Sequence, residues 1–334
     1  MATYLNYPFN PELFNYNWAN EKDLTLTAMF ESGAVQNNSE LARLISNGSD
    51  FYTLPFYKTI GGTPDNYDGN TNITISDPEG GSQSGIVYGR AHGWREQDFV
   101  VDYNSGADPM RQITSQVAKY WAKVRQGILI KILGGVFGVN SGDYADAWGE
   151  HTLDISSADS VTDANKVGAT TVGDAIQKAV GDAADQFGLA VMHSRVATNL
   201  AGLGLLEFRK YTDAQGIERK LNIADINGMT VIIDDGVPVV EGKYETYLFG
   251  TGAIQYAPAS VKTPSEVMRN ATEKGGYNAL VTRVRETLHP NGFSFAKPSG
   301  YAGSPTDAQL GNSANWSIEV NPKGIAIARI ISNG

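Results

Sequence analysis

The segment from Asp108 to Gly134 limits the possible folds most strongly, because its pattern predicts one unusually long helix. Asp108 is a favoured N-cap residue, and Pro109 suits the first helical position. Apolar residues follow at helical spacing, at Ile113, Val117, Tyr120, Trp121, Val124 and Ile128. About 25 residues at 1.5 Å each would make a helix roughly 38 Å long. We expect Gly134 and Gly135 to end it.

The polar positions of this helix are basic. They include Arg111, Lys119, Lys123, Arg125 and Lys131, and no acidic residue occurs between positions 110 and 139. The asymmetry is unusual in this chain, where 36 Asp and Glu residues outnumber 26 Lys and Arg residues and give a net charge of −10. Two interpretations stay open: an ordinary solvated face, or a face turned toward a polyanion or an acidic neighbouring segment.

The composition excludes several classes of protein. A sequence pI near 4.9 excludes, for the chain as a whole, a basic nucleic-acid binder with a pI above about 9. The absence of cysteine excludes disulfide scaffolds, thiolate zinc sites, cysteine nucleophiles and iron–sulfur clusters. A length of 334 residues exceeds what one core usually needs, so we expect one large domain or two intertwined domains.

Residues 1–50 have the character of an arm rather than of a domain. Their aromatic residues follow no helical or strand period: Tyr4, Tyr7, Phe9, Phe14, Tyr16 and Trp18. An extended arm on a neighbouring surface and a wrap around the chain's own core both remain open. No signal peptide is visible, and the longest apolar stretch, residues 127–139, is too short to span a membrane. We therefore expect synthesis in the cytoplasm and no membrane partner.

Residues 51–101 predict a long two-stranded excursion with a glycine-rich tip. The strand-prone runs are Phe51–Lys58, Asn72–Ser76, Gly85–Tyr88 and Asp98–Tyr103. Turn-forming residues separate them, at Gly61-Gly62, Asp68-Gly69 and Gly80-Gly81. An isolated ribbon of this length is marginally stable in water, so it needs a partner surface from its own chain or from another.

The rest of the chain mixes helices and strands. A second helix is predicted from Thr171, and Ser194 is the predicted cap of a third. The predicted strands include Met229–Ile233, Tyr244–Phe249, Ala253–Ala257 and Ala279–Leu288. We expect one hairpin at Gly250-Thr251-Gly252 and another between Trp316–Val320 and Ile325–Ile330. No βαβ rhythm occurs, so the predicted fold class is α+β.

No constellation of residues indicates catalysis, a cofactor or a metal. Each of the histidines lies in a different predicted element: His92, His151, His193 and His289. The pair Asp234-Asp235 falls in a predicted turn, where aspartate is favoured for conformational reasons. We therefore expect no catalytic, cofactor-binding or metal site. An α+β enzyme that uses His193 or Asp234 and Asp235 is the remote alternative.

Several stretches occur in a collinear order that points to a known family. They are residues 87–94 (VYGRAHGW) returning through 98–100 to the long helix, 188–194 (GLAVMHS), 226–235 (INGMTVIIDD) and 283–293 (RVRETLHPNGF). This order resembles that of the major capsid proteins of tailed bacteriophages with the Hong Kong 97-type fold, and the resemblance covers nearly the whole chain.

The resemblance implies a division of the chain. It would consist of an N-terminal arm (1–50), an extended loop (51–101), a peripheral domain with the spine helix (102–149), an axial domain (150–278) and the C-terminal strands of the peripheral domain (279–334). The extended loop would reach over an adjacent subunit and would include Gly61, Gly62, Asp68, Gly69, Gly80 and Gly81. The spine helix would lie toward the lumen of the shell and turn Arg111, Lys119, Lys123 and Arg125 to that side.

The resemblance also implies a function. The chain would be a non-enzymatic shell subunit that assembles into hexamers and pentamers of an icosahedral phage head around double-stranded DNA. An encapsulin-type shell that holds a cargo protein is the alternative within the same fold. Scaffolding, portal and decoration proteins would be separate partners, and no cofactor is expected. Some family members cross-link a loop lysine to a neighbour, but Lys58 lies near the base of this loop, so we expect non-covalent packing.

Overall fold

The structure is a computed structural model of the chain. It describes residues 3–4, 7–8, 29, 32–46, 48–58, 60–70, 72–75, 77–98, 109–158, 160–212, 218–226 and 228–334. The arm expected at residues 1–50 therefore lies largely outside the described residues, as do the helix cap expected at Asp108 and most of the strand expected at Asp98–Tyr103. The described helices are α3 (Ser39–Ser46), α5 (Pro109–Phe137), α6 (Ala145–Gly149), α7 (Thr171–Val180), α8 (Ser194–Gly202) and α9 (Asp307–Leu310).

Helix α5 is the long helix that the sequence predicts, and it is longer than expected. It runs for 29 residues, which corresponds to roughly 44 Å. Gly134 and Gly135 do not end it. A Cβ atom on Gly135 would lie 2.6 Å from the carbonyl oxygen of Leu310 and 2.8 Å from Nε1 of Trp316. Gly135 therefore serves close packing within the helix, a role that local sequence does not distinguish from helix termination.

The larger of the sheets forms the body of the molecule. Among the described residues it has eight strands, in the order β7-β19-β13-β8-β11-β10-β9 with β12 beside β13. Their bounds are β7 Thr152–Asp154, β8 Phe187–Met192, β9 Glu207–Thr212, β10 Glu218–Ile226, β11 Met229–Ile233, β12 Val239–Val240, β13 Lys243–Gly250 and β19 Ile327–Ser332. Strand β8 pairs in parallel with β11 and antiparallel with β13, so the sheet is mixed.

This sheet is buried on both faces. Along β8, Ala190 and Met192 belong to the core that includes buried residues of α7 and α8. Leu189 and Val191 belong to the opposite core, which includes residues of the C-terminal half of α5. The alternation explains why β8 is a continuous apolar run, since a strand covered on both sides has no polar face.

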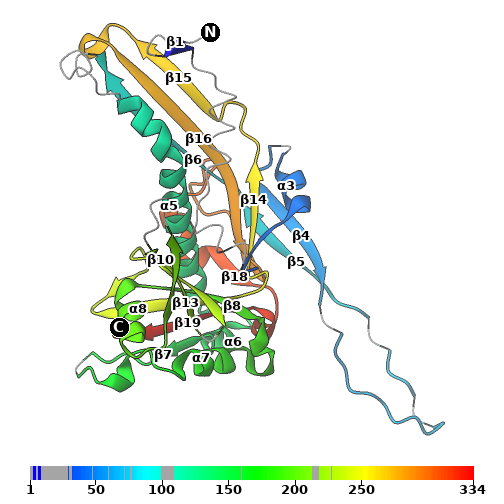
Figure 1. Cartoon of the computed structure of the whole chain (residues 1–334). Helices are drawn as coiled ribbons and strands as arrows, with labels where there is room; N and C mark the ends of the chain where they lie inside the picture. Colours follow the sequence, from blue (N-terminus) through cyan, green and yellow to red (C-terminus); the bar gives the residue numbers. More distant parts are fainter. Residues whose placement is uncertain are drawn as a thin grey trace.

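A second sheet supports the N-terminal half of α5. Among the described residues it has five strands: β3 Val35–Asn37, β6 Tyr88–Gln97, β14 Ile254–Ala259, β15 Ser265–Asn270 and β16 Tyr277–Pro290. Strand β16 is central, because β14 and β15 pair with one of its edges and β6 with the other. Figure 1 shows α5 running along this sheet. Val117 and Trp121 pack there against Leu280, and Trp121 Nε1 donates a 3.1 Å hydrogen bond to Thr282 Oγ1.

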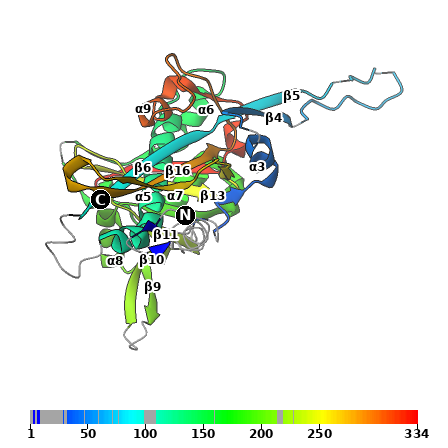
Figure 2. The ribbon, with the colours of Figure 1, turned by 90° about the horizontal axis from the view of Figure 1, so that it is seen from above.

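The ribbon of β4 (Phe51–Tyr57) and β5 (Gly80–Ile86) extends away from both sheets. The two strands pair antiparallel from Phe51 with Ile86 to Tyr57 with Gly80. Residues 60–70, 72–75 and 77–79 continue beyond the ribbon without helix or strand. Figure 2 shows this excursion projecting to one side of the body. The expected two-stranded excursion is therefore present, but the strand expected at Asn72–Ser76 has no partner within the chain's described residues.

Several expected connections between strands are wrong. The turn at Gly250-Thr251-Gly252 links β13 of the eight-stranded sheet to β14 of the five-stranded sheet, so it is not a hairpin. The last expected hairpin is also absent: β18 (Trp316–Ile318) pairs with β17 (Phe293–Phe295), while β19 enters the eight-stranded sheet. A Cβ on Gly250 would lie 2.5 Å from Cβ of Ala326, so close packing rather than a tight turn requires this glycine.

The cap of α8 also differs from the expectation. The N-cap is His193 rather than Ser194, and its Nδ1 accepts a 3.0 Å hydrogen bond from the backbone N–H of Arg195. The expected domain boundary near position 278 stays a prediction. Strands β14 and β15 precede it and pair with one edge of β16.

We predict opposite effects for alanine at the two neighbouring glycines of α5. Gly135→Ala should lower the free energy of unfolding by roughly 1–3 kcal/mol, because its Cβ would overlap the Leu310 carbonyl. Gly134→Ala has no atom within 4 Å of the new Cβ and should raise it by up to about 1 kcal/mol. Chemical denaturation of the unassembled subunit measures both; equal effects would show that Gly135 is not needed for packing.

We also predict that stability falls as the pH drops from about 6.5 to about 4. Burial lowers the pKa of His289 from 6.5 to about 4, and its Nε2 donates to the carbonyl of Phe293. The unfolded chain takes up this proton first, so the unfolded state is stabilised relative to the folded state by roughly 3 kcal/mol across that window. His289→Gln should flatten the dependence in denaturation measured at several pH values. The exposed His92→Gln is the control, and an unchanged slope in His289→Gln would contradict the assignment.

Candidate assembly surfaces

The extended loop exposes apolar side chains that its own subunit does not cover. The most exposed are Tyr57 (85%), Ile60 (84%), Tyr67 (93%), Ile73 (70%) and Ile75 (89%). They lie on the part of the chain that projects farthest from the body (Figure 2). Five large apolar side chains at such exposure on one projecting segment indicate an interaction site.

The loop glycines occupy two different environments. Gly61, Gly62 and Gly69 are exposed beyond the ribbon, together with Asp68, whose Oδ1 accepts a 2.8 Å hydrogen bond from the N–H of Asn70. Gly80 and Gly81, expected at the glycine-rich tip, instead lie within β5. A Cβ on Gly81 would lie 2.6 Å from Cζ of Phe56, its partner across the ribbon. This glycine therefore makes room for an aromatic ring and does not form a turn.

The ribbon is attached to the body through both of its strands. In β4, Tyr52 Oη lies 3.1 Å from Thr287 Oγ1 of β16. The N–H of Gly292 donates a 3.0 Å hydrogen bond to Oε1 of Gln83, and the N–H of Ser84 donates to Oγ of Ser294 at 3.0 Å. Beyond these contacts, the outer end of the ribbon carries a cross-strand ion pair between Lys58 Nζ and Glu79 Oε2 at 3.1 Å. Residues farther out make no contact with the body that the structure describes.

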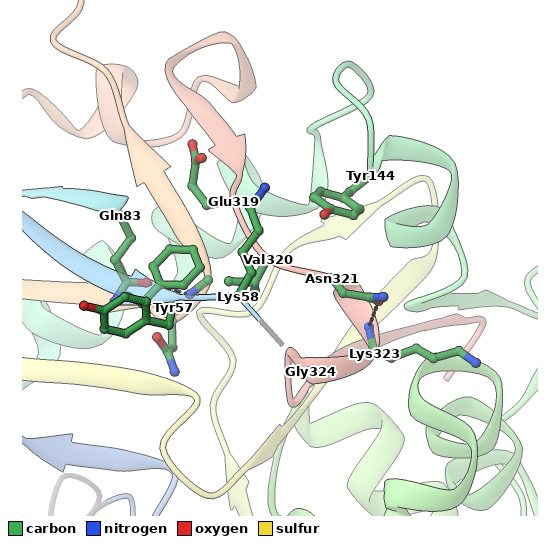
Figure 3. A pocket seen from close by; sticks show the side chains of 12 residues that line it. Tyr57, Lys58, Gln83, Tyr144, Glu319, Val320, Asn321, Lys323 and Gly324 are labelled. Carbon is green, nitrogen blue, oxygen red and sulfur yellow. Dashed lines mark hydrogen bonds between the residues drawn. The ribbon is translucent and has the colours of Figure 1, made fainter. Parts of the chain in front are cut away.

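A groove of about 680 Å³ separates the outer half of the ribbon from the body (Figure 3). Tyr57 and Lys58 of the ribbon line one side, and Glu319 and Lys323 belong to the connection that follows β18. The lining mixes charges of both signs with amide groups and aromatic rings. It contains no paired nucleophile and base among the described residues, so its chemistry suits a protein contact rather than catalysis.

The basic helix face is smaller than expected. Lys119 and Lys123 are exposed on α5 and make no ion pair with any residue that the structure describes. The side chain of Arg111 lies outside the described residues. Arg125 does not belong to this face, because its guanidinium is 17% exposed and binds Glu286. The expected lumen-facing set is therefore corrected to exclude Arg125.

Arg125 instead completes a buried polar cluster. Its Nε lies 3.1 and 3.0 Å from the two carboxylate oxygens of Glu286, and its Nη2 lies 2.9 Å from Oε2. Tyr88 and Tyr256 donate to the same carboxylate at 3.0 and 3.2 Å. Burial and the Glu286 charge raise the pKa of both tyrosines. Burial alone would lower the pKa of Arg125, but Glu286 overcomes this and holds it above its ordinary value.

The buried histidines and Asp235 form hydrogen bonds that stabilise the local structure. His151 and His289 are buried, and each bonds a backbone carbonyl, of Ile327 and Phe293 respectively. Asp235 Oδ1 accepts from the N–H of Ser194 at 3.1 Å and lies 3.6 Å from Nε2 of His193. No group of three or more His, Cys, Asp or Glu residues in the described part of the chain could hold a metal ion. In the part of the chain that the structure describes, no helix is long and apolar enough to cross a membrane.

No sequence pattern indicated that the apolar residues of the loop are functional candidates. Ile60, Tyr67, Ile73 and Ile75 are separated by glycine, asparagine and aspartate, so no helical or strand pattern marks them. Their signal is the presence of large apolar residues in a segment whose turn residues predict exposure to solvent.

Comparison with known proteins places the chain in a family. The family model described as "Major capsid protein 13-like" matches residues 145–326. The major capsid protein of Bacillus phage SPP1 is 32% identical over 327 residues, which cover 96% of this chain and 94% of that protein. Among solved structures, the capsid of Ralstonia phage GP4 has a TM-score of 0.55 at 12% identity, covering 90% of this chain and 87% of the other. The capsid protein of cyanophage Pam1 has a TM-score of 0.54 at 13% identity, covering 89% and 88%.

These similarities confirm the expected α+β class, the Hong Kong 97-type fold and the interpretation as a shell protein. They show that the enzyme alternative is wrong, because the matching family and relative are structural proteins that associate with copies of themselves. The chain belongs to the major capsid protein 13-like family and is a self-associating phage capsid subunit, a component of the virion.

Proposed function

We propose that this subunit assembles into the hexamers and pentamers of an icosahedral phage head that encloses double-stranded DNA. The observation that carries the proposal is the extended loop, which displays large apolar side chains at 70–93% exposure far from its own body. Burying them requires another molecule, and in a shell of repeated subunits that molecule is a second copy.

The same proposal assigns roles along the chain. Residues 1–50 act as an arm and residues 51–101 as the loop that reaches over an adjacent subunit. The eight-stranded sheet with α7 and α8 forms the axial domain around the symmetry axes. The five-stranded sheet and α5 form the peripheral domain. Synthesis takes place in the host cytoplasm, and separate scaffolding, portal and decoration proteins take part in assembly.

The lysines of α5 face the packaged DNA in this proposal. Lys119 and Lys123 are exposed and one helical turn apart, and the helix has no acidic residue near them. Two cations per subunit offer loose neutralisation of phosphate charge without sequence recognition. An acidic chain can therefore enclose DNA without binding it tightly.

Removal of the loop should prevent closure of the shell. A variant in which a short Gly-Ser linker replaces residues 60–78 should remain a folded subunit, because β4 and β5 keep their pairing and their bonds to the body. It should form no closed particles in negative-stain microscopy or sedimentation, because the apolar contact is lost. A control that keeps the full-length loop and carries Thr63→Ala and Asn70→Ala should assemble. Closed particles of normal size from the shortened chain would contradict the role of the loop.

Neutralisation of the two lysines should reduce nucleic acid in the particles without affecting the fold. The double variant Lys119→Gln and Lys123→Gln should form normal shells that retain less nucleic acid, measured as the ratio of absorbance at 260 and 280 nm. Lys262→Gln with Lys274→Gln is the charge-matched control, since both lysines are exposed elsewhere on the subunit. Equal nucleic acid content in all three particles would favour an ordinary solvated face.

A further inference from the structure

Strand β6 has an open edge. Its even-numbered residues direct their backbone groups toward β16, as the hydrogen bond from Asp98 N to the carbonyl of Gly276 shows at the end of the pairing. Its odd-numbered residues therefore direct their N–H and C=O groups to the other side. At Gly89 both groups bond Ser304 Oγ, at 2.9 and 3.2 Å. Farther along, Ala91, Gly93 and Arg95 are exposed and have no partner for these groups among the described residues.

Two features that often block strand pairing, proline and a bulge, are absent from this edge. The stretch from Gly89 to Arg95 contains no proline, and the pairing of β6 with β16 continues through it without a bulge. The side chains of Ala91 and Gly93 are small, so an approaching strand meets no steric obstacle. An open, regular edge of this kind is a template for one more strand.

The extended loop contains a matching unpaired segment. Residues 72–75 (NITI) are rich in β-branched side chains, yet they have no partner strand in their own chain's described residues. The N–H of Thr74 donates to Oδ2 of Asp65 on the opposite side of the loop. In an extended segment, the backbone groups of Ile73 and Ile75 then point away from Asp65, toward solvent.

The charges of the two elements are complementary. Residues 60–79 contain Asp65, Asp68, Asp77 and Glu79 and neither lysine nor arginine. The open edge of β6 ends at Arg95, which makes no ion pair with a described residue and lies 5.8 Å from the ring centroid of Tyr277. Opposite charges favour docking of the loop and oppose contact between two loops.

We propose that residues 72–75 of one subunit add as an antiparallel strand to the β6 edge of a second subunit. In one register Ile73 and Ile75 lie opposite Gly93 and Ala91, where small side chains leave room for isoleucine. In the register one step along, they lie opposite Arg95 and Gly93. The contact is between copies because the loop projects away from its own β6 in both views (Figures 1 and 2). The inference rests on the proposed role of the loop in shell closure and names the surface that receives it.

Proline at the edge tests the backbone contact. Ala91→Pro removes an outward N–H and no bond to β16, so the isolated subunit should keep its unfolding midpoint. Closed shells should fall at least tenfold in sedimentation, whereas Ala91→Ser, which keeps the N–H and a small side chain, should assemble normally. Ile75→Pro and Ile75→Val form the matched pair on the loop. Normal assembly by both proline variants would overturn the proposal.

Engineered cysteines test the same contact by geometry, because the natural chain has none. Directly opposed residues that exchange backbone hydrogen bonds in an antiparallel pair have Cα atoms about 5.5 Å apart, within the range that a disulfide spans. Ile75→Cys combined with Ala91→Cys, or with Gly93→Cys for the shifted register, should give covalent ladders from oxidised shells on non-reducing gels. Ile75→Cys with Met268→Cys is the control, since Met268 is 46% exposed on β15, across the sheet from β6.

The outcomes separate this inference from the proposed function. Failure of both β6 cysteine pairs to cross-link, while the loop deletion still prevents closure, would overturn the β6 contact and leave the loop role standing. Normal shells from the loop deletion would overturn both. Cross-linking of the control pair alone would also overturn the β6 contact, because it would place the loop at the opposite edge of the sheet.

Discussion

The ion pair between Arg125 and Glu286 is the interaction on which the arrangement of the subunit depends. One carboxylate receives hydrogen bonds from α5, β6 and β14, through Arg125, Tyr88 and Tyr256. Glu286 itself belongs to the central strand β16, so four elements meet at one charge. A buried charge is tolerated only when its partners are complete, and loss of one partner from such a pair typically costs about 3–5 kcal/mol.

This cluster also fixes the position of α5 relative to both sheets. Arg125 lies near the middle of the helix. On its N-terminal side Val117 and Trp121 pack on the five-stranded sheet. On its C-terminal side the apolar residues enter the core beneath the eight-stranded sheet. A carboxylate that binds Nε and Nη2 of one arginine also restricts rotation of the helix about its axis, which directs Lys119 and Lys123 to the opposite, exposed face.

Local patterns predicted the elements well and their partners poorly. The periodicity after Pro109 identified α5, and the apolar run at Met229–Ile233 matches β11 residue for residue. The pairing of Trp316–Ile318 with β17 instead of β19 depends on contacts between distant segments, which no local pattern encodes. The same limit applies in part to Arg125. Its place four residues after Trp121 puts it on the apolar side of the helix, away from Lys119 and Lys123, but its partner Glu286 lies 161 residues away.

The glycines of the extended loop show that local sequence does not reveal why a glycine is needed. Gly69 has a φ of 78°, so a turn does require glycine there, as the sequence predicts. Gly81 and Gly85 also lie in a glycine-rich stretch, but they face aromatic residues of β4. Gly81 lies opposite Phe56 and Gly85 opposite Tyr52, and the missing side chain of each glycine leaves space for the ring. The distinction depends on the register of β4 with β5, which no spacing along the chain reveals.

The contact proposed between the loop and β6 has a consequence for symmetry. Each subunit gives one strand and receives one, so the interface is heterologous, and such an interface closes into a ring only if the rotation per subunit divides the circle. The proposed hexamers and pentamers demand different rotations from the same chain. The ribbon can accommodate both, because it is bonded to the body at Gln83 and Ser84 while an open groove lies beneath Tyr57 and Lys58. A rigid connection at that groove would favour one ring size, whereas attachment near the base of the ribbon, at Tyr52, Gln83 and Ser84, lets one contact serve both rings.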